Sequence, residues 1–371
     1  MDWDKVCTLY MQMKKYGVVI YGAGVRGKRA IAFMKRCNIV INTIADRKNI
    51  TTKPYVCIGG VEKLSADDNI VCVYTPLHLD VETKNILMSK FRYCVGMDVI
   101  DILNTHIPEG NQFIYRPYNH YESPFPSAQE ISIGARKQVA RDINLNLSHQ
   151  KEFLEYISSN VMNFELLIHD EASRYNVDNG MYGYEDALVL YSMLNFFHPR
   201  RYIEIGSGWS TCLALDVSER YMNDTLEINC IEPYPQRLLD HIHDKDKIVL
   251  HQDFVQNIEE SFFEQLEKND ILFIDSSHVV KYGGDVCYEY FSILPRLKSG
   301  TIIHIHDIFK DFSYPKEWVP LCYTEAYVLR ALLSDSDRYD ILYFNNMMHN
   351  DLCNRIGHRI LGGSSIWLKV R

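Results

Sequence analysis

The stretch Tyr202-Ile-Glu-Ile-Gly-Ser-Gly-Trp-Ser-Thr211 decides the fold that we predict for the C-terminal half of this chain. A short run typical of a buried strand leads directly into two glycines and then into a helical pattern. In a doubly wound α/β sheet the first turn from strand to helix is the ligand loop, and Gly206 and Gly208 let its backbone approach a ligand closely. The stretch therefore predicts a Rossmann-like domain with a ligand at this turn.

Strand and helix patterns alternate on both sides of this loop. Apolar runs predict C-terminal strands at 201–205, 226–231, 248–251, 270–274, 301–305, 339–344 and 365–370. A helix at 26–36 lies among N-terminal strand patterns at 17–21, 39–45, 56–58 and 69–74. We therefore predict an α/β protein with two Rossmann-like doubly wound domains, at 1–105 and 151–371. A Pro-, Tyr- and Asn-rich linker and connecting segment is expected at 106–150.

Composition narrows the class of protein. A length of 371 residues suits two packed domains, and a formal net charge of −9 argues against nucleic acid as a partner. The ten cysteines show no CxxC pairs, which fits a reducing cytoplasm. Because no apolar run approaches the roughly 20 residues of a membrane span, we expect a cytoplasmic protein. Its expected partner is a small-molecule or glycan acceptor, and a homo-oligomer is compatible with the sequence.

Acidic side chains at the predicted strand ends favour a cationic ligand that contains adenosine. Glu204 precedes the glycines, where a carboxylate would repel a pyrophosphate but attract the amino end or sulfonium of S-adenosylmethionine (SAM). Glu232 ends the second strand, where a carboxylate accepts ribose hydroxyls. Asp253 and Phe254 follow the third strand and suit the adenine amino group and ring face. Four such features make a ligand loop a better interpretation than a plain glycine turn.

The candidate cofactor site also includes neighbouring hydroxyls and aromatic rings. Ring faces attract a sulfonium, but in a chain with 25 tyrosines they equally suit packing. The added residues are Ser207, Trp209, Ser210, Tyr182 and Tyr184.

The ExGxG pattern at 204–208, the acids ending the second and third strands, and Phe273-Ile-Asp275 at the fourth resemble the class I SAM-dependent methyltransferases. The resemblance covers about residues 165–371. Asp275-Ser-Ser-His278, His306-Asp-Ile-Phe309 and the closing Gly-Gly-Ser-Ser-Ile-Trp-Leu look like a bacterial branch related to sugar and antibiotic O-methyltransferases. This resemblance implies methyl transfer from SAM to a hydroxyl of a sugar, in a surface polysaccharide, a glycoside or a nucleotide-sugar precursor.

A hydroxyl is a poor nucleophile near neutral pH, so a base or a metal ion must weaken its bond to the proton. We prefer His278 as the base, with Asp275 and His306 as further catalytic candidates. In the related catechol-type enzymes an aspartate ligand stands at this strand end with a lysine base three residues on, which His278 would replace. Asp275 and Asp307 could share Mg²⁺ or Mn²⁺, whereas other members of the family use no metal. His304, inside the strand, is expected to be a hydrogen-bonded core histidine.

The N-terminal domain carries a second glycine motif. Tyr21-Gly-Ala-Gly-Val-Arg-Gly27 fulfils GxGxxG through Gly22, Gly24 and Gly27, and Asp46 ends the next strand about twenty residues later. Basic residues follow instead of an acid preceding, so an anion such as NAD(P) or another nucleotide suits this turn. The stretch is similar to small Rossmann domains fused to polysaccharide-biosynthesis enzymes. An NAD-dependent oxidoreductase or epimerase of nucleotide sugars, a nucleotide-sensing scaffold without catalysis, and a purely structural unit remain alternatives.

Overall fold

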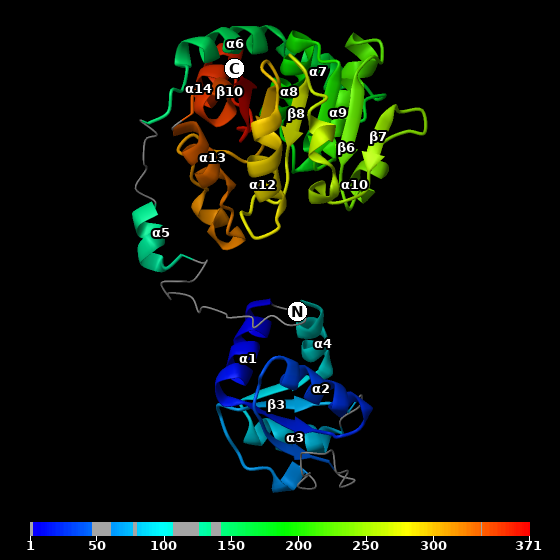
Figure 1. The fold of residues 1–371 in the computed structure, drawn as a ribbon, viewed down its shortest axis with the longest axis vertical. Helices are drawn as coiled ribbons and strands as arrows, with labels where there is room; N and C mark the ends of the chain where they lie inside the picture. The colour runs from blue at the N-terminus through cyan, green and yellow to red at the C-terminus, as the bar shows by residue number, and fades with distance from the viewer. Residues whose placement is uncertain (1–2, 47–60, 77–79, 107–125, 135–141, 335) are drawn as a thin grey trace. The chain divides into compact units, whose positions relative to one another are not determined.

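The computed structural model describes residues 3–46, 61–76, 80–106, 126–134, 142–334 and 336–371 (Figure 1). The chain divides into two compact units, residues 1–123 and 124–371. Among the described residues, none of the helices is long and apolar enough to cross a membrane. Each unit has its own sheet and its own core, as the sequence predicts.

The first unit is built around a four-stranded parallel sheet in the order β2-β1-β3-β4. Its strands are β1 (Val18–Tyr21), β2 (Ile41–Ala45), β3 (Val71–Tyr74) and β4 (Tyr93–Gly96). Its helices are α1 (Trp3–Tyr16), α2 (Val25–Arg36), α3 (Val81–Lys90) and α4 (Met97–His106). The edge strand β4 was not predicted, and the predicted strand at 56–58 lies outside the described residues.

The second unit contains a seven-stranded sheet in the order β10-β11-β9-β8-β5-β6-β7. The last strand, β11, is inserted between β9 and β10 and runs antiparallel to both. Six of the strands thus share one direction, so the carboxyl ends of β5, β6, β8 and β9 meet at one edge. The strands are β5 (Arg201–Ile205), β6 (Glu227–Ile231), β7 (Ile248–His251), β8 (Ile271–Ile274), β9 (Ile302–Ile305), β10 (Tyr339–Phe344) and β11 (Ile366–Val370).

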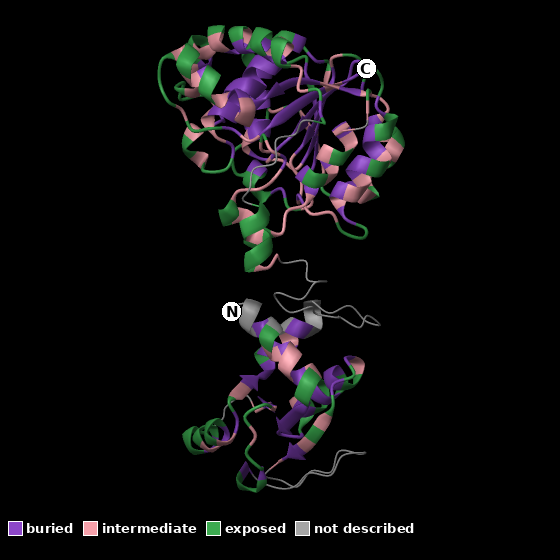
Figure 2. Ribbon diagram, turned by 90° about the vertical axis from the view of Figure 1, so that its left-hand side faces the viewer, coloured by how far each residue is buried: buried purple, intermediate pink, exposed green. Residues whose placement is uncertain are grey.

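Helices cover both faces of this sheet, and each face has its own hydrophobic core. Figure 2 shows the buried strands as a purple layer and the outer faces of the helices in green. The long helices are α6 (Leu147–Ser159), α7 (Val161–Ile168), α8 (Tyr184–Phe197), α9 (Trp209–Tyr221), α13 (Glu325–Ser334) and α14 (Asn345–Ile356). Short helices are α5 (Ala128–Gly134), α10 (Gln236–Leu239), α11 (Glu260–Phe263) and α12 (Asp285–Tyr288).

The second unit begins earlier in the sequence than the predicted residue 151. Ile143 is buried in the core, and helix α6 already starts at Leu147. The Nδ2 group of Asn146 donates to the carbonyl of Ile341, and Asp142 pairs with Arg330. Much of the final part of the expected linker is therefore packed against β10 and α13.

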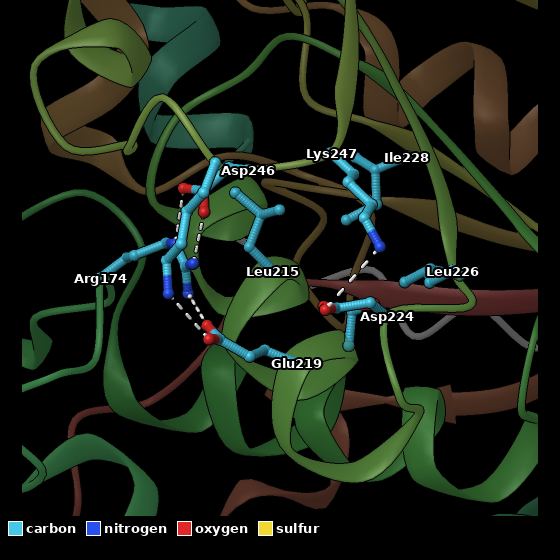
Figure 3. A pocket seen from close by; sticks show the side chains of 10 residues that line it. Arg174, Leu215, Glu219, Asp224, Leu226, Ile228, Asp246 and Lys247 are labelled. Carbon is cyan, nitrogen blue, oxygen red and sulfur yellow. Dashed lines mark hydrogen bonds and ion pairs between the residues drawn. The ribbon is translucent and has the colours of Figure 1, made fainter.

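A buried arginine in the segment before α8 forms ion pairs with acids on α9 and before β7. The guanidinium of Arg174, 3% exposed, lies 2.8 Å from Asp216, 2.5 Å from Asp246 and 2.9 Å from Glu219. Figure 3 shows it beside a cavity of about 30 Å³, which has room for about one water molecule. Each charge is paired, and the cavity is too small for a substrate, so this cluster is structural.

Candidate active site

The predicted ligand loop at residues 204–211, which we call the cofactor loop, is shaped by a close contact between the ends of β5 and β8. Gly206 follows β5 with a φ of +83°, and a Cβ atom there would lie 2.0 Å from the carbonyl oxygen of Asp275. The Asp275 N–H donates to the carbonyl of Ile205, which continues the pairing of β5 and β8. Glycine is thus required where the loop passes over the end of β8.

Glu204 lies beneath this loop and not in the open cavity. Its side chain is fully buried, and it accepts hydrogen bonds from the hydroxyls of Ser210 and Thr211 on the first turn of α9. The Gly208 N–H donates in turn to Thr211. Burial raises the pKa of Glu204 to about 8, against the effect of the two hydroxyls. The predicted attraction of a free carboxylate to the SAM cation is therefore replaced by a role in holding the loop.

A cavity of about 450 Å³ opens at the carboxyl edge of the sheet, beside the loop. Gly206, Glu232, Tyr234, Phe254 and Asp275 line it, together with both serines that follow Asp275. Its size is within the range typical of small-molecule sites. The cavity thus unites residues that the sequence predicted from four separate strand ends.

Glu232 is held at the wall of this cavity by backbone groups. Its Oε2 accepts from the Ser207 N–H at 3.2 Å, and its Oε1 accepts from the Tyr234 N–H at 2.8 Å. The Oγ atom of Ser207 is buried and makes no hydrogen bond among the described residues. A ribose hydroxyl bound near Glu232 would be a hydrogen-bond partner for the Ser207 Oγ atom. This wall of the cavity therefore suits the adenosine part of SAM.

Other predicted cofactor residues lie farther from the cavity. Asp253 accepts from the Phe254 N–H and from Asn257, both at 2.7 Å, and does not belong to the cavity lining. The ring of Trp209 stacks on His241, with centroids 4.2 Å apart. Tyr184 donates to Glu165 and packs edge-on against Phe164, so it joins α8 to α7. A cofactor contact of these residues stays a prediction.

Four side chains converge beyond the cavity, where β8 and β9 end. Nε2 of His278 lies 3.4 Å from both Asp275 and Asp307. Nδ1 of His306 lies 3.5 Å from Asp275 and 3.4 Å from Asp307. His278 and Asp307 both have a φ of +58°, an unusual conformation for residues other than glycine. Strained backbone of this kind concentrates at functional sites.

Two buried carboxylates from helices hold the far sides of the imidazoles. Oε2 of Glu325, from α13, lies 2.8 Å from Nδ1 of His278. Oδ2 of Asp186, from α8, lies 3.6 Å from Nε2 of His306, and the Tyr182 ring packs 5.4 Å from the same imidazole. Four carboxylates thus surround two histidines. The sequence offered no signal for Glu325 or Asp186, because both come from distant helices.

The charges of this cluster favour protonated histidines. Burial alone would lower the pKa of His278, but Asp275 and Glu325 raise it to about 10. Burial likewise opposes the charge on His306, and Asp275 and Asp307 raise its pKa well above the usual value. A protonated imidazole cannot accept a proton, so this raised pKa disfavours His278 as the base, and its catalytic role stays a prediction.

Residues 362–365, which we call the serine strap, close the site from the side of β11. The Ser364 Oγ donates to Asp307 at 2.9 Å, and the Ser365 Oγ donates to Asp186 at 2.5 Å. The Gly363 N–H donates to the buried Glu185 at 2.9 Å. The closing Gly-Gly-Ser-Ser motif therefore orients two acids of the cluster.

The predicted metal pair and His304 have different surroundings. Within the described part of the chain, no group of three or more His, Cys, Asp or Glu side chains is arranged to hold a metal ion. A cation shared by Asp275 and Asp307 would require the two imidazoles to lose their protons or move. His304 stacks on Phe273, with centroids 3.7 Å apart, and burial keeps its pKa well below the usual value. It is a core residue, as expected, but neither ring nitrogen has a hydrogen-bond partner among the described residues, so the expected hydrogen bonds are absent.

The glycine motif of the first unit forms a tight turn between β1 and α2. Gly22 has a φ of +100°, and a Cβ atom at Gly27 would lie 2.0 Å from the Gly22 carbonyl oxygen. Oδ2 of Asp46 accepts from the Ala23 N–H at 2.7 Å, and nothing lies within 4 Å of a Cβ atom built on Gly24. A nucleotide at this turn stays a prediction.

Comparison with known proteins bears directly on the second unit. A family model described as a methyltransferase domain matches residues 203–308, from β5 to just past Asp307. An uncharacterised protein of Archaeoglobus fulgidus is 35% identical over 167 residues, which cover 42% of this chain and 75% of that protein. The chain belongs to the same family as this archaeal protein. It is a SAM-dependent methyltransferase.

Two solved structures illustrate what this methyltransferase is similar to. A Podospora anserina methyltransferase with bound S-adenosylhomocysteine shares 16% identity over 62% of this chain and 98% of its own, with a TM-score of 0.37. The plantazolicin methyltransferase BpumL, in complex with a desmethyl analogue and S-adenosylhomocysteine, shares 11% identity over 61% of this chain and 99% of its own, with a TM-score of 0.34.

The family match falls on the residues that form the cavity. Its 106 positions, residues 203–308, include the cofactor loop, Glu232, Phe254 and Asp275. The buried, unpartnered Ser207 hydroxyl and the glycine-lined approach at Gly206 both suit a bound cofactor. The family match therefore spans all the residues that line this cavity, and a SAM site there stays a prediction.

Proposed function

We propose that this methyltransferase transfers the methyl group of SAM to a hydroxyl oxygen. The observation that carries the proposal is the cluster of Asp275, His278, His306 and Asp307 directly beside the cofactor cavity. Amine nucleophiles arrive as cations that must lose a proton, whereas a hydroxyl needs a hydrogen-bond acceptor aligned during attack. As acceptor we propose a sugar hydroxyl of a surface polysaccharide, glycoside or nucleotide-sugar precursor, which rests on the resemblance in the motifs.

Asp275 is placed to accept the acceptor's proton. It lines the cofactor cavity, its side chain is 34% exposed, and both histidines contact its Oδ1 atom. Its Oδ2 atom is left to accept a hydrogen bond from the attacking hydroxyl. As the oxygen–methyl bond forms, the hydroxyl proton moves to this carboxylate and then to solvent. When bound, SAM supplies the methyl carbon on a sulfonium, whose sulfur leaves as a neutral thioether.

His278 and His306 act as positioning residues in this scheme. Burial opposes the charge of Asp275, but the positive charges of the two histidines hold its pKa well below the usual range although four carboxylates meet there. Glu325 fixes the ring of His278, and Asp186 faces that of His306. In this scheme His278 is a fixed cation, whereas the sequence analysis preferred it as the base.

A divalent cation is the alternative way to activate the hydroxyl. Hard cations such as Mg²⁺ prefer carboxylate oxygens, and Asp275 and Asp307 are the residues that would hold one. Such an ion would lower the pKa of the acceptor hydroxyl. The charges of the two histidines oppose it in the arrangement described above. Activity after treatment with a chelator, with and without added Mg²⁺, separates the two schemes.

The test combines SAM binding with product analysis. Purified protein is incubated with SAM and a panel of glycosides and nucleotide sugars, and methylated products are located by mass spectrometry. The Asp275→Asn variant should bind SAM normally by calorimetry but turn over about 100-fold more slowly or worse, since general-base assistance contributes on that scale. Asp311→Asn, on the loop after β9, is the matched control. Methylation at nitrogen or carbon, or an active Asp275→Asn variant, contradicts the proposal.

A further inference from the structure

A second cluster of reactive side chains lies on α14, away from the cofactor cavity. Cys353 and His349 stand one helical turn apart, and the Cys353 sulfur lies 3.7 Å from Nε2 of His349. Nδ1 of the same imidazole lies 2.6 Å from Oε2 of Glu185. Thiol, imidazole and carboxylate thus form a chain in which the acid orients the base and the base faces the nucleophile.

Glu185 is an unusual member of this chain because it is fully buried, at 0% exposure, while His349 is 28% exposed. Its Oε1 atom makes no hydrogen bond among the described residues, and burial raises its pKa to about 8 against the effect of the Gly363 N–H. A buried acid with one oxygen on an imidazole fixes the orientation of that ring. The Cys353 sulfur lies beside this ring, 3.9 Å from Nδ1 and 3.7 Å from Nε2, and Nε2 is the nitrogen that the carboxylate does not contact.

Comparison with the other half-buried cysteines described in the second unit shows what distinguishes Cys353. The thiols of Cys287 and Cys322 donate to backbone carbonyls, at 3.1 and 3.8 Å. A carbonyl oxygen can only accept the thiol's hydrogen bond and cannot take its proton. The imidazole beside Cys353 can take the proton and leave the nucleophilic thiolate.

Cys353 also opens onto a cavity of about 400 Å³. The lining residues are His349, Asn350, Cys353, Asn354, Gly357, His358 and Arg359. Arg359 supplies positive charge where the helix ends, and no acidic side chain belongs to this lining. The partial negative charge at the C-terminal end of a helix disfavours a thiolate, so His349 must supply the activation. The cavity is suited to a reagent that carries carboxylates.

We propose that Cys353 is a site of thiol–disulfide exchange with an anionic low-molecular-weight disulfide of the glutathione type. The Cys353 thiol gives its proton to Nε2 of His349, and the thiolate attacks one sulfur of the disulfide. A new disulfide bond forms to Cys353 as the bond within the reagent breaks. The departing thiolate takes the proton from His349, so Cys353 is oxidised and half of the reagent is reduced to a free thiol.

The experiment treats the full-length protein with glutathione disulfide at pH 7 and measures the modification of each cysteine by peptide mass spectrometry over time. Cys353 should react about tenfold faster than Cys287 and Cys322, because it alone of the three has a neighbouring imidazole that can accept the thiol proton as the sulfur attacks. His349→Gln should reduce the rate at Cys353 to that of Cys287. Asn350→Ala, which changes the same cavity without touching the relay, should leave it unchanged.

A second variant tests the anionic reagent and does not disturb the buried acid. Arg359→Gln should slow modification by glutathione disulfide several-fold, and leave the rate with neutral hydroxyethyl disulfide unchanged. Equal rates at Cys353 and Cys287, or full reactivity in folded His349→Gln protein, overturn the proposal. If Arg359→Gln slows both reagents equally, the preference for an anion is wrong. These readouts do not depend on methyl transfer.

Discussion

A Cβ atom at Gly206 would lie 2.0 Å from the carbonyl oxygen of Asp275. The loop that approaches the cofactor therefore passes directly over the residue proposed to accept the acceptor's proton. The Asp275 N–H bonded to the Ile205 carbonyl adds a second link between the same strand ends. We therefore expect cofactor binding and the proposed proton transfer to depend on the same contact between the ends of β5 and β8.

Gly206→Ala tests this contact. The substitution should destabilise the protein by at least about 2 kcal/mol and abolish SAM binding, since it adds a clash with backbone to an unfavourable φ. Urea unfolding and calorimetry measure the two effects. Gly283→Ala is the control, because Gly283 also has a positive φ, of +68°, but a Cβ atom there meets nothing within 4 Å. Equal losses in both variants would show that φ alone matters.

Glu232→Ala should weaken SAM binding about 10- to 100-fold, because hydrogen bonds to charged groups contribute roughly 1.5–3 kcal/mol. Calorimetry with SAM gives the dissociation constant directly. Asp253→Ala serves as the comparison, since Asp253 bonds to Phe254 and Asn257 and does not line the cavity. A larger loss in Asp253→Ala than in Glu232→Ala would reverse our assignment of the adenosine wall.

The raised pKa of the buried Glu204 side chain predicts a specific pH dependence of the free energy of unfolding. Because the pKa is raised from 4.5 to about 8, the folded protein holds a proton that the unfolded chain loses between these values. Stability relative to the Glu204→Gln variant should therefore be greatest below pH 4.5 and fall as pH rises through 8, by at most about 1.4 kcal/mol per pH unit. Urea unfolding of both proteins from pH 5 to 8 measures the difference. A constant difference would mean that Glu204 is ionised throughout.

Arg174→Met should destabilise the second unit by about 3–5 kcal/mol, because it leaves Asp216 and Asp246 buried without a counter-charge. Burial opposes the charge of Arg174, but the neighbouring acids raise the pKa of its guanidinium, which agrees with tight ion pairs. Arg296→Met provides the contrast. Arg296 pairs with Glu260 and Glu264 but is 49% exposed, and exposed pairs contribute about 0–1 kcal/mol. Chemical denaturation of the two variants should differ clearly.

The fold was largely predictable because its strands are short apolar runs bounded by turns. β5 and β10 have the same bounds as the apolar runs that predicted them, 201–205 and 339–344. The strand β4 was missed because Tyr93-Cys-Val-Gly96 is short and lies at an edge of the sheet. The antiparallel insertion of β11 could not be read from its own sequence. Pairing between β9 and β11 joins segments about sixty residues apart, and no local pattern specifies such a partner.

The site was predictable to the extent that it stands on strand ends. Glu232 and Asp275 meet in one cavity because parallel strands end at a common edge. The charge states were not predictable, since they depend on Glu325 and Asp186, which reach the histidines from helices distant in the sequence. The partners of Glu204 are local in sequence. Its carboxylate was predicted to attract a ligand, but the hydroxyls of Ser210 and Thr211, on the first turn of α9, donate to its two oxygens.

The position of β11 determines the order in which parts of the site can form during synthesis of the chain. β10 pairs with β11, and the serine strap immediately precedes that strand, so neither β10 nor Asp307 has these partners until residues 362–370 have been synthesised. The cofactor loop and Glu232 are complete more than a hundred residues earlier. During synthesis the loop at Gly206 and the cavity wall at Glu232 can therefore form first, whereas Asp307 gains its serine partner only when β11 is inserted into the existing sheet.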